Sequence, residues 1–405
     1  MRVEHLWKRT SMRESIKIDG VRALYLNNLL RSMAGSMVGV FFPAYVYLWG
    51  YNIGGFGYGI KVLILSMVIE RTIVFLMGMP LGKIVLRLGF KKSILISSFI
   101  LASWFLLPVI FERSLALISV LSVISGIAIP IYWLARMSIF SIDGGNNNDF
   151  GKEVSIISLT DQVASILAPF VGGVLLVFGG FGLLFGTATL ICILAAIPIF
   201  FIGDYKIVDG ISLKRFVQSV KSKQELHLHL GFIGQGVANM VDAYFWPLYI
   251  FIFVGSFAVL GTITSITFAL SSVAIYFAGK IFDRRRAMGG MEDEKEFTVA
   301  TIVLAFLTML RPITRSLLGI FSLDASYKMA YPFWSVDEDS YLFSAGKRAK
   351  SPLEFYTYRE LIYSAARVVS PLLLLLFLES GYFWWITFGL GSLGTILTLG
   401  MQKES

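Results

Sequence analysis

Long apolar runs separated by short polar stretches recur along the whole chain. Each run holds about 18 or more residues, enough for a helix rising 1.5 Å per residue to cross ~30 Å of hydrocarbon. The pattern predicts twelve membrane-spanning helices, spans one to twelve, near residues 23–49, 60–80, 93–111, 114–137, 155–178, 181–202, 230–253, 257–279, 297–314, 316–336, 356–378 and 382–400.

The pattern of runs in the first half of the chain is repeated in the second half. Three prolines near the middle of apolar runs recur 204, 202 and 202 residues later, as the pairs Pro43 and Pro247, Pro130 and Pro332, and Pro169 and Pro371. The expected parts are a tail (1–22), a first six-helix bundle (23–203), a linker (204–229), a second bundle (230–401) and a short tail (402–405). Two similar helical halves in a membrane leave a cavity along their pseudo-symmetry axis, where alternating-access transporters bind substrate.

Composition agrees with a bilayer as the solvent, because 56% of the 405 residues are hydrophobic and 15% are charged. No cleavable signal is expected, since residues 1–22 are polar and basic. The single cysteine, Cys192, excludes an intramolecular disulfide, and no metal site or cofactor is expected from His5, His227 and His229.

Basic residues gather in every second loop, which sets the expected orientation. The tail is basic, and the same excess follows spans two, six and eight, with Lys83, Arg87, Lys91 and Lys92, then Lys206, Lys214, Arg215, Lys221 and Lys223, then Arg284, Arg285 and Arg286. Both termini are therefore expected in the cytoplasm, with the protein in the cytoplasmic (inner) membrane. The net charge of +9 reflects these loops, so no nucleic-acid partner is expected.

The loop after span two carries a recognisable motif, Gly82-Lys83-Ile84-Val85-Leu86-Arg87-Leu88-Gly89-Phe90-Lys91-Lys92. It resembles the Gly-x-x-x-Asp-Arg-x-Gly-x-Arg-Arg loop of the major facilitator superfamily, with Leu86 in place of the aspartate. The second half keeps a partial copy, Gly279-Lys280-Ile281-Phe282-Asp283-Arg284. In span five, Ala164, Ala168-Pro169 and Gly172-Gly173 resemble a pattern of the superfamily's antiporters, although small residues beside proline are also ordinary packing features.

The resemblance implies an all-α membrane protein of twelve transmembrane helices in two pseudo-symmetric six-helix bundles. It also implies a gate formed by Gly82, Arg87, Gly89, Lys91, Lys92, Gly279, Asp283 and Arg284. In the superfamily the aspartate at this position contacts the start of span eleven, so Leu86 is expected to weaken that contact. Asp283 is expected to make the corresponding contact with the start of span five, near Gly151 to Ser155. The alternative is a basic loop that only follows the positive-inside bias.

Polar residues on spans one, four, seven and ten mark the candidate binding site. In the superfamily these four spans line the central cavity, and charges kept inside a bilayer usually have a function. The candidates are Asn27, Arg31, Tyr132, Trp133, Gln235, Asn239, Asp242, Trp246, Asp324, Tyr327, Lys328 and Tyr331. An alternative is that Asp324 and Lys328 neutralise each other at i and i+4 and only pack two helices.

A second set of charges lies on spans two and eleven, which meet between the halves in this fold. Glu70 and Arg367 are expected to form a gating ion pair. Failing that pair, Arg367 is expected beside Tyr363 as a contact for an anionic substrate group. The candidate proton carriers are Asp242, Asp324 and Glu70, because a carboxylate in the membrane can have its pKa raised into the working range.

These features predict a secondary active transporter that moves a small molecule by alternating access, with the proton as coupling ion. Transport powered directly by ATP hydrolysis is disfavoured because no nucleotide-binding loop of the type Gly-x-x-x-x-Gly-Lys-[Ser/Thr] occurs. A membrane enzyme is disfavoured because the short loops are poor in catalytic residue types, and no obligate protein partner is evident. The alternative is a transporter-like sensor that binds a ligand without turnover. The sequence leaves two substrate classes open, a polar or zwitterionic metabolite and an amphipathic compound.

Overall fold

The computed structural model describes residues 23–143, 150–202, 210–223, 225–287, 295–349 and 351–404, and these ranges are helical nearly throughout. The first half, defined as the helices before the linker, begins with a helical segment at 23–39. It continues with α2 (Phe42–Leu88), α3 (Phe90–Ile110), α4 (Leu115–Asp143), α5 (Phe150–Ala196) and the short η1 (Ile197–Phe201).

The second half follows a short linker helix, α6 (Leu213–Lys221), which the sequence pattern did not single out. Its elements are α7 (Leu226–Met240), η2 (Val241–Phe245), α8 (Trp246–Val254), α9 (Phe257–Ala287), α10 (Lys295–Leu310), η3 (Arg311–Ile313), α11 (Leu317–Arg348), α12 (Pro352–Leu375), α13 (Phe383–Leu397) and η4 (Thr398–Glu404). Together α7, η2 and α8 make up span seven.

Two helical stretches, Ala23–Leu88 and Thr160–Phe201, each contain two spans joined at a glycine. Gly55 in α2 has φ +70°, and Gly180 in α5 has φ +61°. Only glycine adopts this left-handed region at little cost, so both positions turn the chain back sharply. In the described ranges, eight helical segments are long and apolar enough to cross a membrane. Two of them are these double spans, and the more charged α11 and α12 add two more, in agreement with the predicted twelve.

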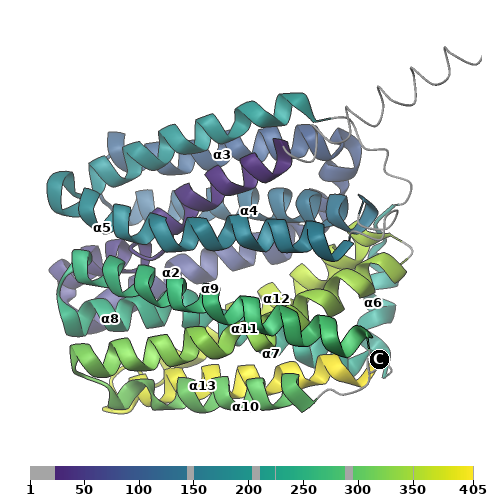
Figure 1. Ribbon diagram of the computed structural model, residues 1–405. Coiled ribbons are helices and arrows are strands. Elements are labelled where there is room, and N and C mark those ends of the chain that lie inside the picture. Colours follow the sequence, from purple (N-terminus) through teal and green to yellow (C-terminus); the bar gives the residue numbers. More distant parts are fainter. Residues whose placement is uncertain are drawn as a thin grey trace, which may run out of the picture.

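The helices of the two halves lie side by side, with α3 and α5 of the first half at the top of Figure 1 and α10 and α13 of the second half at the bottom. Between them, α5 packs against α9 and α2 packs against α12, so these four helices join the halves. One end of the bundle carries α6 and the connections near residues 89 and 350, and is called the basic end. The opposite end, with the connections near residues 112, 255 and 379, is called the short-loop end.

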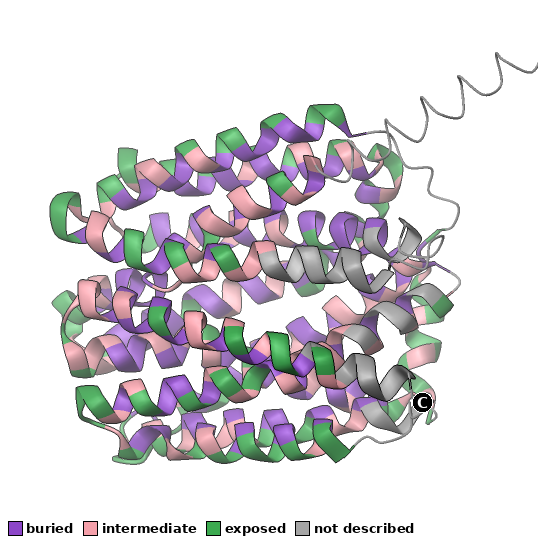
Figure 2. Ribbon diagram, in the orientation of Figure 1, coloured by how far each residue is buried: buried purple, intermediate pink, exposed green. Residues whose placement is uncertain are grey.

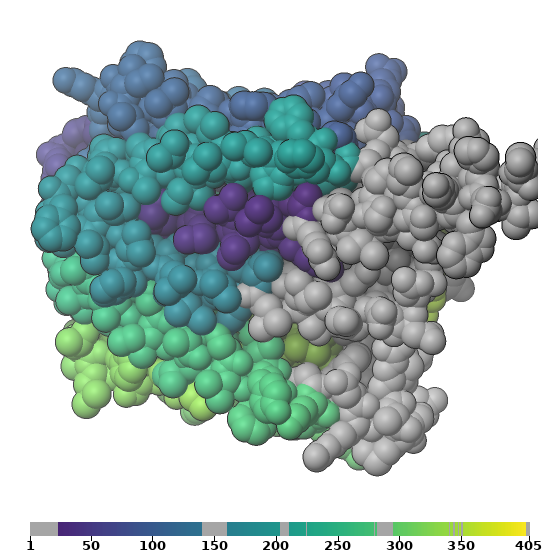
Figure 3. Space-filling model, turned by 45° about the horizontal axis from the view of Figure 1, so that its top comes forward, coloured from purple at the N-terminus to yellow at the C-terminus, as the bar shows by residue number. Residues whose placement is uncertain are grey.

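Apolar side chains cover the outside of the bundle as well as its core. Figure 2 shows exposed positions along the outward faces of many helices. Phe178 is 82% exposed and Leu318 is 75% exposed, which is the pattern of helices solvated by lipid chains. The space-filling view in Figure 3 shows the early residues, in purple, as a strip on one face between later, teal helices.

The halves touch at both ends of the bundle. At the short-loop end the rings of Phe41 and Phe257 lie 6.0 Å apart, and those of Phe56 and Phe383 also lie 6.0 Å apart. At the basic end Gly82 of α2 faces Thr357 of α12, and a Cβ added to Gly82 would lie 3.0 Å from the Thr357 hydroxyl. The halves therefore contact each other at both ends of the bundle.

Close approach of α5 and α9 depends on two glycines. A Cβ on Gly173 would lie 2.9 Å from the Phe257 carbonyl oxygen, and a Cβ on Gly261 would collide with the Pro169 carbonyl oxygen. Such small residues let membrane helices pack backbone to backbone.

We predict that Gly261→Ala lowers the thermal stability of the purified protein by ~1–3 kcal/mol, because the obstructing atom belongs to the backbone and cannot rotate away. The matched control is Gly186→Ala in α5, where a Cβ would meet nothing within 4 Å. The control should leave the melting temperature unchanged or slightly higher. Equal melting temperatures for the two variants would show that α5 and α9 do not approach this closely.

Candidate functional site

Asp242 occupies an irregular turn in the middle of span seven. Residues Val241–Phe245 form a π-helix, and Pro247 lies two residues after its end. Short π-helical turns inside α-helices are frequent at functional sites. The Asp242 carboxylate accepts hydrogen bonds from Arg311 Nη1 at 2.5 Å and from the Tyr327 hydroxyl at 2.5 Å. The turn therefore aims the carboxylate at span ten and at the end of span nine.

Arg311 is the counter-ion of Asp242. Its side chain is 1% exposed, against 26% for Asp242, so only the acid of this pair keeps access to surrounding space. The guanidinium lies 4.6 Å from the Trp246 ring centre and 4.4 Å from that of Tyr327. Sequence reasoning missed Arg311 because it precedes Pro312 at the end of an apolar run, where a basic residue usually belongs to a loop.

Asp324 has neutral partners. The Trp246 indole N–H donates to one oxygen at 2.8 Å and the Thr267 hydroxyl to the other at 2.6 Å. Lys328 instead lies over the Phe268 ring, 4.0 Å from its centre. The alternative in which Asp324 and Lys328 neutralise each other is wrong, because both carboxylate oxygens already accept bonds from α8 and α9.

Asp161 on span five organises the polar residues of the first half. Its carboxylate accepts bonds from Asn28 Nδ2 at 2.9 Å, from the Ser32 hydroxyl at 2.5 Å and from Arg136 Nη2 at 2.8 Å. The Tyr132 hydroxyl donates to Asn28 Oδ1 at 3.1 Å, which brings span four into the cluster. Arg136 could have been found from its position one turn after Tyr132 on the same face of span four.

Two candidates on span one do not bind Asp161. Asn27 donates to the Ala195 carbonyl oxygen at 2.5 Å, and the Arg31 guanidinium donates to Ser97 and Ser98 of α3. Arg31 also stacks on the Tyr132 ring at 3.8 Å. The sequence assignment of Asn27 was off by one position, because successive residues on a helix point about 100° apart.

The remaining candidates on the polar faces differ in their surroundings. Gln235 accepts a hydrogen bond from Arg359 Nη2 at 2.7 Å, and Asn239 is exposed although it lies in mid-span. Trp133 is 42% exposed and Tyr331 is 37% exposed. These side chains keep free surface that a ligand can contact.

Charges on α2 and α12 join the two halves. Glu70 pairs with its neighbour Arg71 at 2.6 Å, and Arg71 reaches Glu360 of α12 at 3.5 Å. Tyr244 of η2 donates to Glu70 at 3.1 Å. The expected Glu70–Arg367 ion pair is therefore wrong, because Arg71 and Tyr244 already satisfy Glu70.

The predicted gate is partly described. Gly89 ends α2 with φ +80°, and Lys91 donates to the Phe200 carbonyl oxygen at 2.9 Å, at the carboxyl end of η1. Arg87 and Lys92 are exposed. Leu86 packs beside the apolar cluster that includes Leu353 and Tyr356 near the start of α12. The side chains of Gly279, Asp283, Arg284 and of 151–155 lie outside the described residues.

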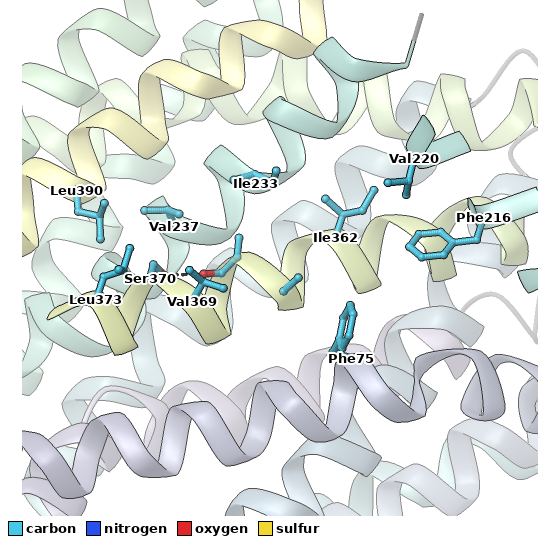
Figure 4. Close-up of a pocket in the computed structure, with 12 residues that line it drawn as sticks. Phe75, Phe216, Val220, Ile233, Val237, Ile362, Val369, Ser370, Leu373 and Leu390 are labelled. Carbon is cyan, nitrogen blue, oxygen red and sulfur yellow. Dashed lines mark hydrogen bonds between the residues drawn. The ribbon is translucent and has the colours of Figure 1, made fainter. Parts of the chain in front are cut away.

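A cavity of about 560 Å³ lies apart from all these polar groups. Its lining is almost entirely apolar and comes from α2, α6, α7, α12 and α13, with Phe75, Ile233 and Val369 among the residues labelled in Figure 4. On α12 it uses Ile362, Ala365, Ala366 and Val369, whereas Arg359, Tyr363 and Arg367 form a different stripe of the same helix. We therefore place the functional site among the buried polar groups.

The comparisons with known proteins agree with this architecture. The sequence profile of the Major Facilitator Superfamily matches residues 24–336. The chain belongs to this superfamily and is a multi-pass membrane transporter. Among solved structures it is similar to the human organic anion transporter MFSD10 (TETRAN), with a TM-score of 0.68, 15% identity, and coverage of 95% of this chain and 99% of that one. No curated protein matches the sequence.

We predict strong thermodynamic coupling between Asp242 and Arg311. Asp242→Asn or Arg311→Gln alone leaves one charge unpaired in a low-dielectric site, which typically costs ~3–5 kcal/mol, whereas the double substitution should cost less. The measurement is a double-mutant cycle on thermal unfolding in detergent. Additive effects of the two substitutions would show that the pair does not form.

Proposed function

We propose that the protein is a secondary active transporter that moves a small organic molecule by alternating access and is coupled to protons. The basic end faces the cytoplasm, so that both termini lie there and the protein resides in the cytoplasmic membrane. The distribution of Lys and Arg supports this orientation, because basic loops are retained on the cytoplasmic side.

The ion pair of Asp242 is the observation that carries the proposal. A partly exposed carboxylate faces a fully buried guanidinium at a π-helical turn in mid-membrane. Protonation of Asp242 would remove its attraction to Arg311 and free the Tyr327 hydroxyl. Proton uptake would thereby change the contact of span seven with spans nine and ten, which is how a proton can bias one conformation over another.

The junction of Glu70, Arg71, Tyr244 and Glu360 supports the alternating-access part. These contacts cross from α2 to η2 and α12, which belong to opposite halves. Rocking of the halves would break and remake them, as expected for contacts that exist in one state only. Because the halves contact each other at both ends of the bundle, opening of one set of contacts while the other stays closed would give the two alternative states.

The substrate has to be inferred from this chain's own side chains. The structural neighbour is an organic anion transporter, and at 15% identity that likeness shows the fold alone. Counterflow in proteoliposomes, with a library of metabolites and amphipathic compounds, tests the proposal. Exchange of any one compound supports a carrier, whereas ligand binding without exchange would indicate a sensor.

We predict that Asp242→Asn abolishes accumulation driven by a proton gradient but retains counterflow, because the amide cannot exchange a proton. Glu112→Gln is the matched control, since Glu112 is an exposed carboxylate at the short-loop end. Uptake by the control should keep the pH dependence of the unaltered protein. Gradient-driven accumulation with unaltered pH dependence in Asp242→Asn would exclude this residue as the proton carrier.

A further inference from the structure

The polar stripe of α12 carries two arginines without an acidic partner among the described residues. Arg71, Arg136 and Arg311 all form ion pairs in the membrane region. Arg359 donates only to the neutral Gln235, and Arg367 donates only to the Tyr363 hydroxyl at 3.2 Å. Because uncompensated charge inside a bilayer is costly, these two groups require a ligand or a function.

Tyr363 lies between the two arginines. Both guanidiniums lie 5.3 Å from the centre of its ring, one on each side along the helix, at i−4 and i+4. Arg367 is 4% exposed, and its Nε atom has no hydrogen-bond partner, which is also true of Arg359 Nε. The stripe therefore presents two N–H donors that no described residue accepts, one on each side of Tyr363.

Acidic groups near the stripe are already engaged or too far for ion pairs. Glu360 pairs with Arg71, and Glu70 is held by Arg71 and Tyr244. Glu338 and Asp339 of α11 act on Arg359 electrostatically from beyond ion-pair distance. Among the described residues, no acid therefore forms an ion pair with Arg359 or Arg367, because the nearest carboxylates are engaged by Arg71.

We propose that Arg359 and Arg367 bind the carboxylate of an aromatic organic anion and that this anion is the transported substrate. The proposal rests on the transport function argued above. Guanidinium binds carboxylates through paired N–H donors, which an ammonium group cannot do in the same geometry. Tyr244 and Tyr363, whose rings lie 5.5 Å and 5.3 Å from the Arg367 guanidinium, offer aromatic surface for the ring of such a molecule.

Matched ligands test the charge requirement. Thermal unfolding of the purified full chain is followed with benzoate, naphthalene-2-carboxylate and anthracene-2-carboxylate, each beside its amide, and with inorganic phosphate. We expect at least one carboxylate to raise the melting temperature while its amide and phosphate do not, since bound ligand stabilises the folded state. An equal shift with the amide, no shift with any carboxylate, or an equal shift with phosphate would overturn the proposal.

Matched variants test the residues. Arg367→Gln and Arg359→Gln should each weaken carboxylate binding about tenfold or more, and Arg367→Lys should weaken it less than Arg367→Gln. Without ligand, Arg367→Gln should not lower the melting temperature, whereas Arg71→Gln should, because only Arg71 has ionic partners to lose. Lys221→Gln on α6 is the control and should bind as the unaltered chain does. Unchanged binding by both Arg367→Gln and Arg359→Gln would overturn the assignment.

The two proposals can fail separately. If carboxylate binding needs Arg367 but the same compound shows no counterflow, the transport proposal is contradicted and the anion-site proposal is supported. If neutral or cationic compounds show counterflow that Arg367→Gln does not affect, the transport proposal is supported and the anion-site proposal is contradicted.

Discussion

Pairing of buried charges is the constraint on which the rest of this structure depends. A charged side chain in the middle of a bilayer costs ~2.5–3.5 kcal/mol on insertion scales, and the cost falls when an opposite charge or several hydrogen bonds meet it. In each half, an acid collects donors from several helices. Asp161 gathers spans one, four and five, and Asp242 gathers spans seven, nine and ten.

The Asp161 and Asp242 clusters each link helices of one half. Their hydrogen bonds do not cross the boundary between the halves, so movement of the halves would leave them intact. The contacts of Glu70 and Arg71 with Tyr244 and Glu360 cross the boundary and are fewer. Few ionic contacts cross the boundary, and the close packing of α5 on α9 and of α2 on α12 crosses it as well, so rocking of the halves would exchange both kinds of contact.

The sequence predicted the spans better than the partners of their charged residues. Spans follow from the length of apolar runs, which the bilayer thickness sets for each run independently. Partners depend on how helices are rotated and how far side chains reach. Asp242 pairs with Arg311, 69 residues away and at the edge of a span, after a π-helical turn changes the direction of the helix face. Asn28, and not Asn27, meets Asp161 because one residue along a helix changes the direction by about 100°.

Movement of the two halves relative to each other can be measured as distances between spin labels at both ends of the bundle. Labels at Ile53 and Tyr382 report on the short-loop end, and labels at Leu88 and Leu226 report on the basic end, all four being exposed positions. The buried Cys192 is replaced by serine so that only these sites react. The account predicts two distance populations at each end, the long distance at one end accompanying the short distance at the other as pH or ligand changes. A single distance at both ends under every condition would contradict it.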